Sequence, residues 1–307
     1  MSQSRSALLF PGLDALFVTK NLLKWHTVPY VQEKLKTASK YLSTITSQEE
    51  DLSKFLLENR RIHIVDFDRT LIVLTTIQVA VAELILDKVK WDIAQGCSHG
   101  DIARNVICGV LKFEAAIDIL WVFSNLRKKC PEGYTASVRS IDKQKITNEQ
   151  YEWLEGQKAC VSTWSEENVT VGGDCEYIDR LSKEGLEVGL KIRSILSYPV
   201  HSNAMNILLE EILSYKDRWD FKNPKYKMFS SIWLRYIDSG KDAFEEGVAG
   251  AVNPVKWIET LKCLVEKEDV QTFINIGPSN TLTKQILEPT KFSHIKTLDA
   301  WDLFNGE

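Results

Sequence analysis

KVKWDIAQGCSHGDIARNVICG, residues 88–109, is the stretch from which the rest of the sequence is interpreted. From Val89 to Ile93, apolar and charged residues alternate, which predicts a short strand. Residues 96–100, GCSHG, fit the pattern G-x-S-x-G, and Asp101 to Cys108 then have helical spacing. A strand, a tight turn and a helix in this order are typical of a strained turn that exposes a serine hydroxyl.

Ser98, at the centre of this pattern, is therefore predicted to be a nucleophile. Gly96 and Gly100 give the backbone room for so sharp a turn. The first backbone N–H of the predicted helix, on His99, would point at the group that Ser98 attacks. We interpret the remaining chain as the structure that holds Ser98 in place for this reaction.

The composition indicates an ordinary globular protein, with 307 residues, 44% hydrophobic and 26% charged. A net charge of −4 gives no basic field, so we expect no nucleic-acid partner. The six cysteines form no C-x-x-C pair and no zinc-type spacing with histidine, so free thiols and no metal site are expected.

The N-terminus does not resemble a signal peptide, and no apolar run reaches the length needed to span a membrane. We therefore expect a soluble, cytoplasmic protein without a membrane partner.

Two kinds of segment alternate along the chain outside the serine turn. Buried strands are predicted at Ser6–Phe10, Lys227–Ile237 and Thr272–Ile276. Leu71–Leu86 is the most apolar segment and is predicted to be a buried helix, and Leu111–Lys128 has apolar residues at helical spacing.

Between Tyr134 and Leu196 the pattern changes to short strands that alternate with two predicted helices, Asn148–Gly156 and Glu176–Glu184. Two β-α-β units of this length predict a small ferredoxin-like insertion. We therefore expect a large α/β subdomain from residues 1–131 and 199–307, with a small subdomain at 132–198.

Seven segments, in order, resemble the malonyl-CoA:acyl-carrier-protein transacylase family, which includes the acyltransferase domains of polyketide synthases. They are LLFPG (8–12), TIQVA (76–80), GCSHGD (96–101), LKFEAAIDI (111–119), SYPVHSNAM (197–205), NPVKW (253–257) and INIGPSNTLT (274–283). The resemblance spans nearly the whole chain. It implies an α/β-hydrolase-like large subdomain with a parallel sheet, and a ferredoxin-like small one.

The resemblance assigns a catalytic pair. His201 follows a proline-containing turn, and by itself it could be a structural histidine or a base; the resemblance favours the base that takes the proton of Ser98. The family orients this histidine through a backbone carbonyl, which would be that of Asn253 here. The resemblance therefore implies a Ser-His dyad without a carboxylate partner.

The oxyanion hole implied by the family uses two backbone N–H groups, those of His99 and Leu13. The family has glutamine where this chain has Leu13, but an amide hydrogen does not depend on the side chain. Gln78 is expected to help order the substrate pocket.

Phe123 occupies the position where malonyl-using members of the family have an arginine. Arg127 lies a full turn further on and is expected to face elsewhere. A malonate carboxylate buried beside a phenyl ring would cost several kcal/mol without a partner. Val200 replaces a residue that is often phenylalanine, which widens the pocket. We therefore expect an uncharged acyl group in place of malonyl.

The implied partners are an acyl thioester and an acyl carrier protein, in polyketide or fatty-acid biosynthesis. No bound cofactor is expected, because the substrate itself carries the phosphopantetheine arm. Basic residues that could meet an acidic carrier protein are Arg127, Lys128, Lys129, Lys183, Lys191 and Arg193.

Three alternatives remain beside a trans-acting acyltransferase. An acyl-carrier-protein hydrolase, in which water attacks the acyl ester, would have the same residues. A non-catalytic carrier-protein binder is disfavoured by an intact Ser98 and His201. A phosphatase is suggested by DFDRT (66–70), in which Asp66 and Asp68 would bind magnesium, but no matching later motif follows and a surface loop is the simpler interpretation.

Overall fold

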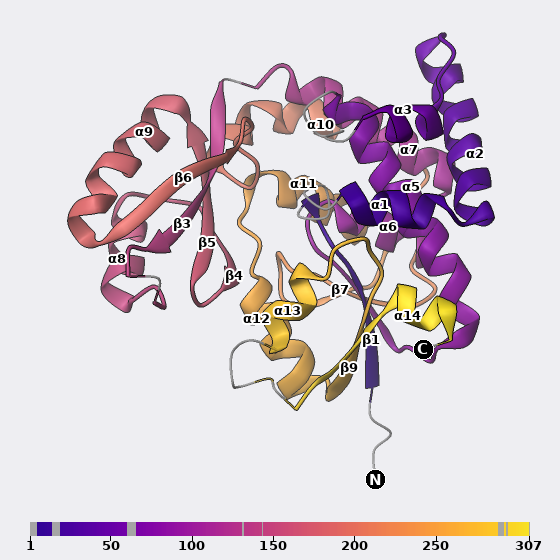
Figure 1. The fold of residues 1–307 in the computed structure, drawn as a ribbon. Coiled ribbons are helices and arrows are strands. Elements are labelled where there is room, and N and C mark those ends of the chain that lie inside the picture. The colour runs from indigo at the N-terminus through magenta and orange to yellow at the C-terminus, as the bar shows by residue number, and fades with distance from the viewer. Residues whose placement is uncertain are drawn as a thin grey trace.

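The computed structural model describes residues 5–13, 19–59, 66–130, 132–142, 144–287, 292 and 294–306. The strands of these residues form two separate sheets (Figure 1).

The larger sheet has six strands in the order β10-β9-β1-β2-β7-β8, and all neighbours are parallel except β7 and β8. Its strands are β1 (Arg5–Phe10), β2 (Ile93–Gly96), β7 (Lys227–Phe229), β8 (Tyr236–Ile237), β9 (Val270–Asn275) and β10 (Lys296–Asp299). Strand β2 therefore lies near the centre of the sheet, between β1 and β7. The predicted α/β class with a largely parallel sheet is confirmed.

Two strand predictions in this sheet are corrected. The strand before the serine turn begins at Ile93, where the alternating run ends, and all four residues of β2 are buried. A central parallel strand is covered on both faces, so it shows no alternation. The single strand predicted over residues 227–237 is two short strands, β7 and β8, joined by a turn.

Helices cover the large sheet, and the most deeply buried is α5 (Phe67–Ile85). The prediction of a buried helix here is confirmed. With the turn that follows it, residues 67–88 are long and apolar enough to cross a membrane, contrary to the expectation that no segment reaches that length. Of the most apolar window, 72% is buried inside the structure, as in the core helix of a globular protein.

The remaining helices lie on both faces of this sheet, because the buried residues form two hydrophobic clusters, one with α5, Leu8 and Phe10 and another with Ala7, Leu9 and Trp257. They are α1 (Thr19–His26), α2 (Pro29–Thr46), α3 (Leu52–Glu58), α6 (Gly100–Ile107), α7 (Phe113–Arg127), α10 (Leu209–Ser214), α11 (Gly240–Val252), α12 (Trp257–Lys262), α13 (Thr281–Leu287) and α14 (Ala300–Asn305).

The smaller sheet has four antiparallel strands in the order β4-β5-β3-β6. Its elements are β3 (Gly133–Ser140), α8 (Asn148–Gly156), β4 (Val161–Ser165), β5 (Asn168–Asp174), α9 (Cys175–Glu184) and β6 (Leu190–Leu196). This order is the split β-α-β arrangement of a ferredoxin-like fold, which confirms that prediction. The sheet also has a hydrophobic cluster of its own. We propose on this basis that the small subdomain spans 132–198 and the large one 1–131 and 199–307.

Candidate active site

Ser98 occupies a strained turn between β2 and α6. Its φ is +55°, a left-handed conformation that costs a residue other than glycine of order 1–3 kcal/mol. A Cβ on Gly96 would lie 2.7 Å from Asp101 Cα, and one on Gly100 would lie 2.7 Å from the Phe10 carbonyl carbon. Both glycines of the motif are therefore required by close backbone approach. The turn is the one that the sequence pattern predicts.

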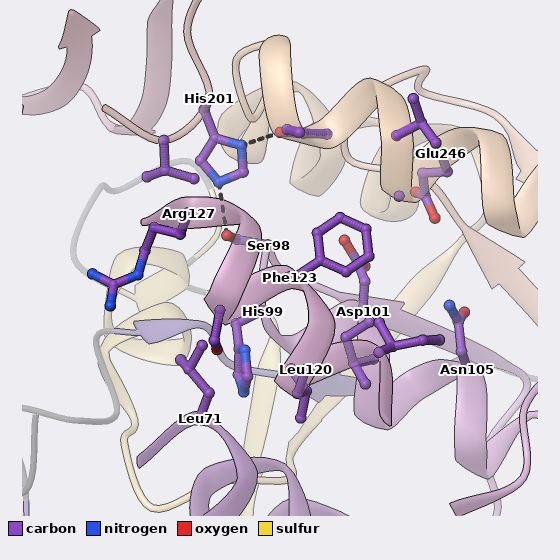
Figure 2. A pocket seen from close by; sticks show the side chains of 18 of the residues that line it. Leu71, Ser98, His99, Asp101, Asn105, Leu120, Phe123, Arg127, His201 and Glu246 are labelled. Atoms are coloured by element: carbon purple, nitrogen blue, oxygen red, sulfur yellow. Dashed lines mark hydrogen bonds between the residues drawn. The ribbon is translucent and has the colours of Figure 1, made fainter. Parts of the chain in front are cut away.

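His201 lies beside Ser98 although 103 residues separate them in the chain. Its Nε2 is 2.7 Å from Ser98 Oγ (Figure 2). On the other side of the ring, Nδ1 donates to the Gly250 carbonyl oxygen at 2.5 Å. With Nδ1 protonated, Nε2 is the acceptor that faces the serine hydroxyl. The structure thus brings together the two predicted side chains in the geometry that a general base needs.

The Gly250 carbonyl, which the sequence did not single out, is the larger of two backbone partners of the His201 ring, so the prediction of Asn253 by itself was incomplete. A backbone bond to Asn253 contributes as well, as the lesser of the two. Gly250 lies in the last turn of α11, where the carbonyls have no partner within the helix. The imidazole donates to the Gly250 carbonyl oxygen, and the His201 backbone N–H donates to the Ala251 carbonyl oxygen at 3.1 Å. The histidine therefore caps a helix while it faces the serine.

Burial lowers the pKa of His201 to about 4, against the opposing effect of the two backbone hydrogen bonds. A base must be neutral, so activity that depends on it is lost only as the pH falls through this lowered value. We expect the second-order rate of Ser98 acylation to have its acidic midpoint near pH 4. Rapid-quench mass spectrometry from about pH 3 to 9 would measure it, with circular dichroism at each pH as the control for folding. A midpoint near the ordinary histidine value of 6.5 would contradict this assignment.

The two predicted oxyanion residues, His99 and Leu13, line the same cavity as Ser98. The side chain of His99 contacts α5, with Nε2 2.9 Å from Thr75 Oγ1, and burial lowers its pKa to about 4. This neutral ring fixes the start of α6. Leu13 is half-buried and, like His99, lines the cavity beside Ser98.

Gln78, which is expected to help order the pocket, is fully buried and is not among the residues that line the cavity. Its Nε2 donates to the Pro11 carbonyl oxygen at 2.6 Å. Gln78 therefore braces the loop that carries Leu13 against α5, and does not contact the substrate space. An interior helix position cannot be told from a pocket position by sequence alone.

One cavity of about 200 Å³ opens at Ser98 and His201 and continues between α6, α7 and α11. Phe123 and Val200 line it, as predicted. The Phe123 ring stacks on Trp219, with centroids 6.3 Å apart. The wall away from the serine is largely apolar and includes Ile102, Ile119, Leu120, Phe123, Trp219, Phe221 and Phe244.

Arg127 also lines this cavity, so the prediction that it faces elsewhere is wrong (Figure 2). Residues four apart on a helix share a face, which places Arg127 on the same side of α7 as Phe123. Its guanidinium already has a carboxylate partner, since Nη2 is 3.3 Å from Asp68 Oδ1. It also lies over two aromatic rings, Phe67 at 4.6 Å and Tyr198 at 5.6 Å.

Asp66 and Asp68 do not lie on a surface loop, so that interpretation is wrong. Asp66 caps α5 by accepting from the Arg69 backbone N–H, and Asp68 is buried in the first turn. The strand predicted before them, at 61–65, lies outside the described residues. Among the residues described, no group of three or more His, Cys, Asp or Glu side chains could hold a metal ion.

A buried ion cluster that the sequence did not reveal forms one side of the cavity. Arg104 is fully buried and contacts Asp101 at 2.8 Å and Glu246 at 2.5 Å. Burial and the nearby charge of Glu246 raise the pKa of Asp101 to about 7, against the opposing effect of Arg104. The available signal was the pair of opposite charges at Asp101 and Arg104, three residues apart on the helix after the serine.

Comparison with known proteins matches residues 38–300 to the family described as the acyl transferase domain. The chain is 23% identical to a malonyl CoA-acyl carrier protein transacylase of Staphylococcus aureus over 316 residues, covering 96% of this chain and 97% of that protein. The structure of the corresponding protein from Coxiella burnetii is similar, with a TM-score of 0.81 at 21% identity, covering 99% of this chain and 96% of that one. So is a malonyl-transacylase solved in complex with a type II polyketide synthase acyl-carrier protein, with a TM-score of 0.81 at 19% identity, covering 99% and 100%.

Proposed function

The chain belongs to the acyl transferase domain family, and from that premise we propose that it transfers an uncharged acyl group through an ester on Ser98. The enzyme is an acyltransferase of fatty-acid or polyketide synthesis. The acyl donor is a thioester and the acceptor is an acyl carrier protein. The enzyme needs no cofactor of its own, because the phosphopantetheine belongs to the substrate.

The observation that carries this proposal is the hydrogen bond between Ser98 Oγ and His201 Nε2. As Oγ attacks the thioester carbonyl, Nε2 takes its proton and the C–S bond breaks. The departing thiolate receives that proton, which leaves acyl-Ser98, a free thiol and a neutral imidazole. The thiol of the carrier protein's arm then attacks the ester by the same steps in reverse.

The negative oxygen of each tetrahedral intermediate needs donors that are already in place. We assign this role to the backbone N–H groups of His99 and Leu13, which flank Ser98. His99 starts α6, and the bond from Gln78 to Pro11 holds the loop that ends at Leu13. Losing one such donor typically lowers kcat by about 10²–10³.

The cavity supports an uncharged acyl group in two ways. Most of the surface that lines the cavity is apolar, and Phe123 is part of it, although Asp101, Arg127 and Glu246 line it as well. The positive charge of Arg127 is already balanced by Asp68, so a substrate carboxylate would gain little from it. Removing such a carboxylate from water costs several kcal/mol, which corresponds to a loss in affinity of about two or more orders of magnitude.

The proposal of a carrier-protein acceptor rests on family membership and on the relative solved with its carrier protein. The predicted basic surface is smaller than the sequence suggested. Lys128 is paired with Asp68 and Lys129 with Glu211. Exposed cations on the four-strand sheet, Lys191 and Arg193, are therefore the better candidates for contact with an acidic partner.

We expect acetyl- and hexanoyl-CoA to leave a covalent adduct on the protein at least tenfold faster than malonyl-CoA. Intact-mass spectrometry after incubation with each thioester measures this, and addition of holo-acyl carrier protein measures transfer. Faster adduct formation from malonyl-CoA would refute the substrate choice, and no adduct from any thioester would refute the activity. Rapid release of free acid without an acceptor would identify a hydrolase instead.

A further inference from the structure

We propose that Asp68 is a specificity-determining residue. It forms an ion pair with Arg127, the cationic side chain that lines the acyl cavity, and thereby excludes acyl groups that end in a carboxylate. This inference rests on the proposed function, because it concerns the acyl group that Ser98 accepts. It gives a role to the second carboxylate of the DFDRT segment, which the catalytic chemistry does not use.

Arg127 is held where it could meet an acyl group. Its side chain is 24% exposed and lines the same cavity as Ser98, His201 and Phe123. The Phe67 ring, 4.6 Å from the guanidinium carbon, supports it from one side. A planar guanidinium held by an aromatic face keeps its position when a hydrogen-bond partner changes.

The contact between Arg127 and Asp68 is loose. The bond from Nη2 to Asp68 Oδ1 is long, at 3.3 Å, and it is a single bond. A carboxylate binds arginine best through two parallel N–H groups. Asp68 therefore does not use the full binding capacity of the guanidinium, which a substrate carboxylate could take if the charge of Asp68 did not repel it.

Asp68 is the group that prevents this. Only 8% of its side chain is exposed, and it contacts both Arg127 and Lys128, whose Nζ is 2.6 Å from Oδ2. A substrate carboxylate would have to approach this buried negative charge to reach Arg127. Like charges this close, and partly out of water, are strongly disfavoured. Lys128 is more than half exposed, so without Asp68 it can turn to solvent while Arg127 stays.

The test is the ratio of acyl-enzyme formed from malonyl-CoA to that formed from hexanoyl-CoA. In both reactions Ser98 Oγ displaces free CoA, and the proton passes through His201. We expect Asp68→Asn to raise this ratio at least tenfold, because an amide cannot balance two cations and Arg127 becomes available. Asp68→Ala is a second variant that should show the same direction.

Asp66→Asn is the matched control. It makes the same change of charge two residues away, at a side chain that pairs with Arg69 and not with Arg127, and it should leave the ratio within twofold of the wild type. In the double variant Asp68→Asn/Arg127→Met the gain should disappear, since the receiving cation is gone.

An unchanged ratio in both Asp68 variants would overturn the inference, and so would a gain that persists without Arg127. These results differ from failure of the proposed function, in which the wild type forms no adduct with any thioester.

Discussion

Ser98→Ala is expected to abolish acyl-enzyme formation and to lower acyl transfer by at least about 10⁴-fold, since no other hydroxyl occupies the turn. The 2.7 Å contact with His201 makes Oγ the atom that is activated. Intact-mass spectrometry with a neutral acyl-CoA and a discontinuous transfer assay would measure both losses. If the variant takes up acyl label as well as the wild type does, the protein is a non-catalytic binder.

Ser98→Gly separates this loss from damage to the fold. Because φ at Ser98 is +55°, glycine relieves strain that alanine retains. The glycine variant should be as inactive as the alanine variant, with a melting temperature no lower than that of the wild type. If the glycine variant were inactive and also unfolded, only the alanine variant would test the role of the hydroxyl. Activity and melting temperature are therefore measured on the same samples.

Gly100→Ala is expected to have the largest effect on stability, at least about 3 kcal/mol in the free energy of unfolding. The added methyl group would lie 2.7 Å from the carbonyl carbon of Phe10 and 2.8 Å from the Pro11 carbonyl oxygen. These are backbone atoms at the end of β1, so relief requires moving α6 away from the sheet. Urea denaturation followed by circular dichroism would measure the loss.

Gly156→Ala is the control for this substitution, because a Cβ at Gly156, the last residue of α8, meets nothing within 4 Å. It should change the free energy of unfolding by less than about 1 kcal/mol. If Gly100→Ala proved equally mild, the close packing of α6 on β1 would be wrong.

The small subdomain was the most predictable part of the fold, because its signals are local. Helix α8 has the bounds that the sequence predicts, Asn148–Gly156. Its start is set by a capping box in which Thr147 and Gln150 bond each other's backbone. Alternating residues and turns mark the strands on either side, so no long-range information was needed.

Helix α11 (Gly240–Val252) was missed, and with it two residues of the site. Its sequence, GKDAFEEGVAGAV, has three glycines, which lower its helix propensity, although Phe244, Val248 and Ala251 lie at helical spacing. Gly250, which orients His201, and Glu246, which pairs with Arg104, both lie on it. The error about Arg127 had another cause, since a residue one turn beyond Phe123 returns to the same face.

His201 follows β6 of the four-strand sheet, whereas Ser98 follows β2 of the six-strand sheet. His201 is nevertheless held from the side of the large sheet, because its Nδ1 and its backbone N–H both donate to carbonyls at the end of α11. A movement of the small sheet would therefore reach the proposed catalytic pair through the residues between Leu196 and His201, and the helix end that receives the imidazole would oppose it.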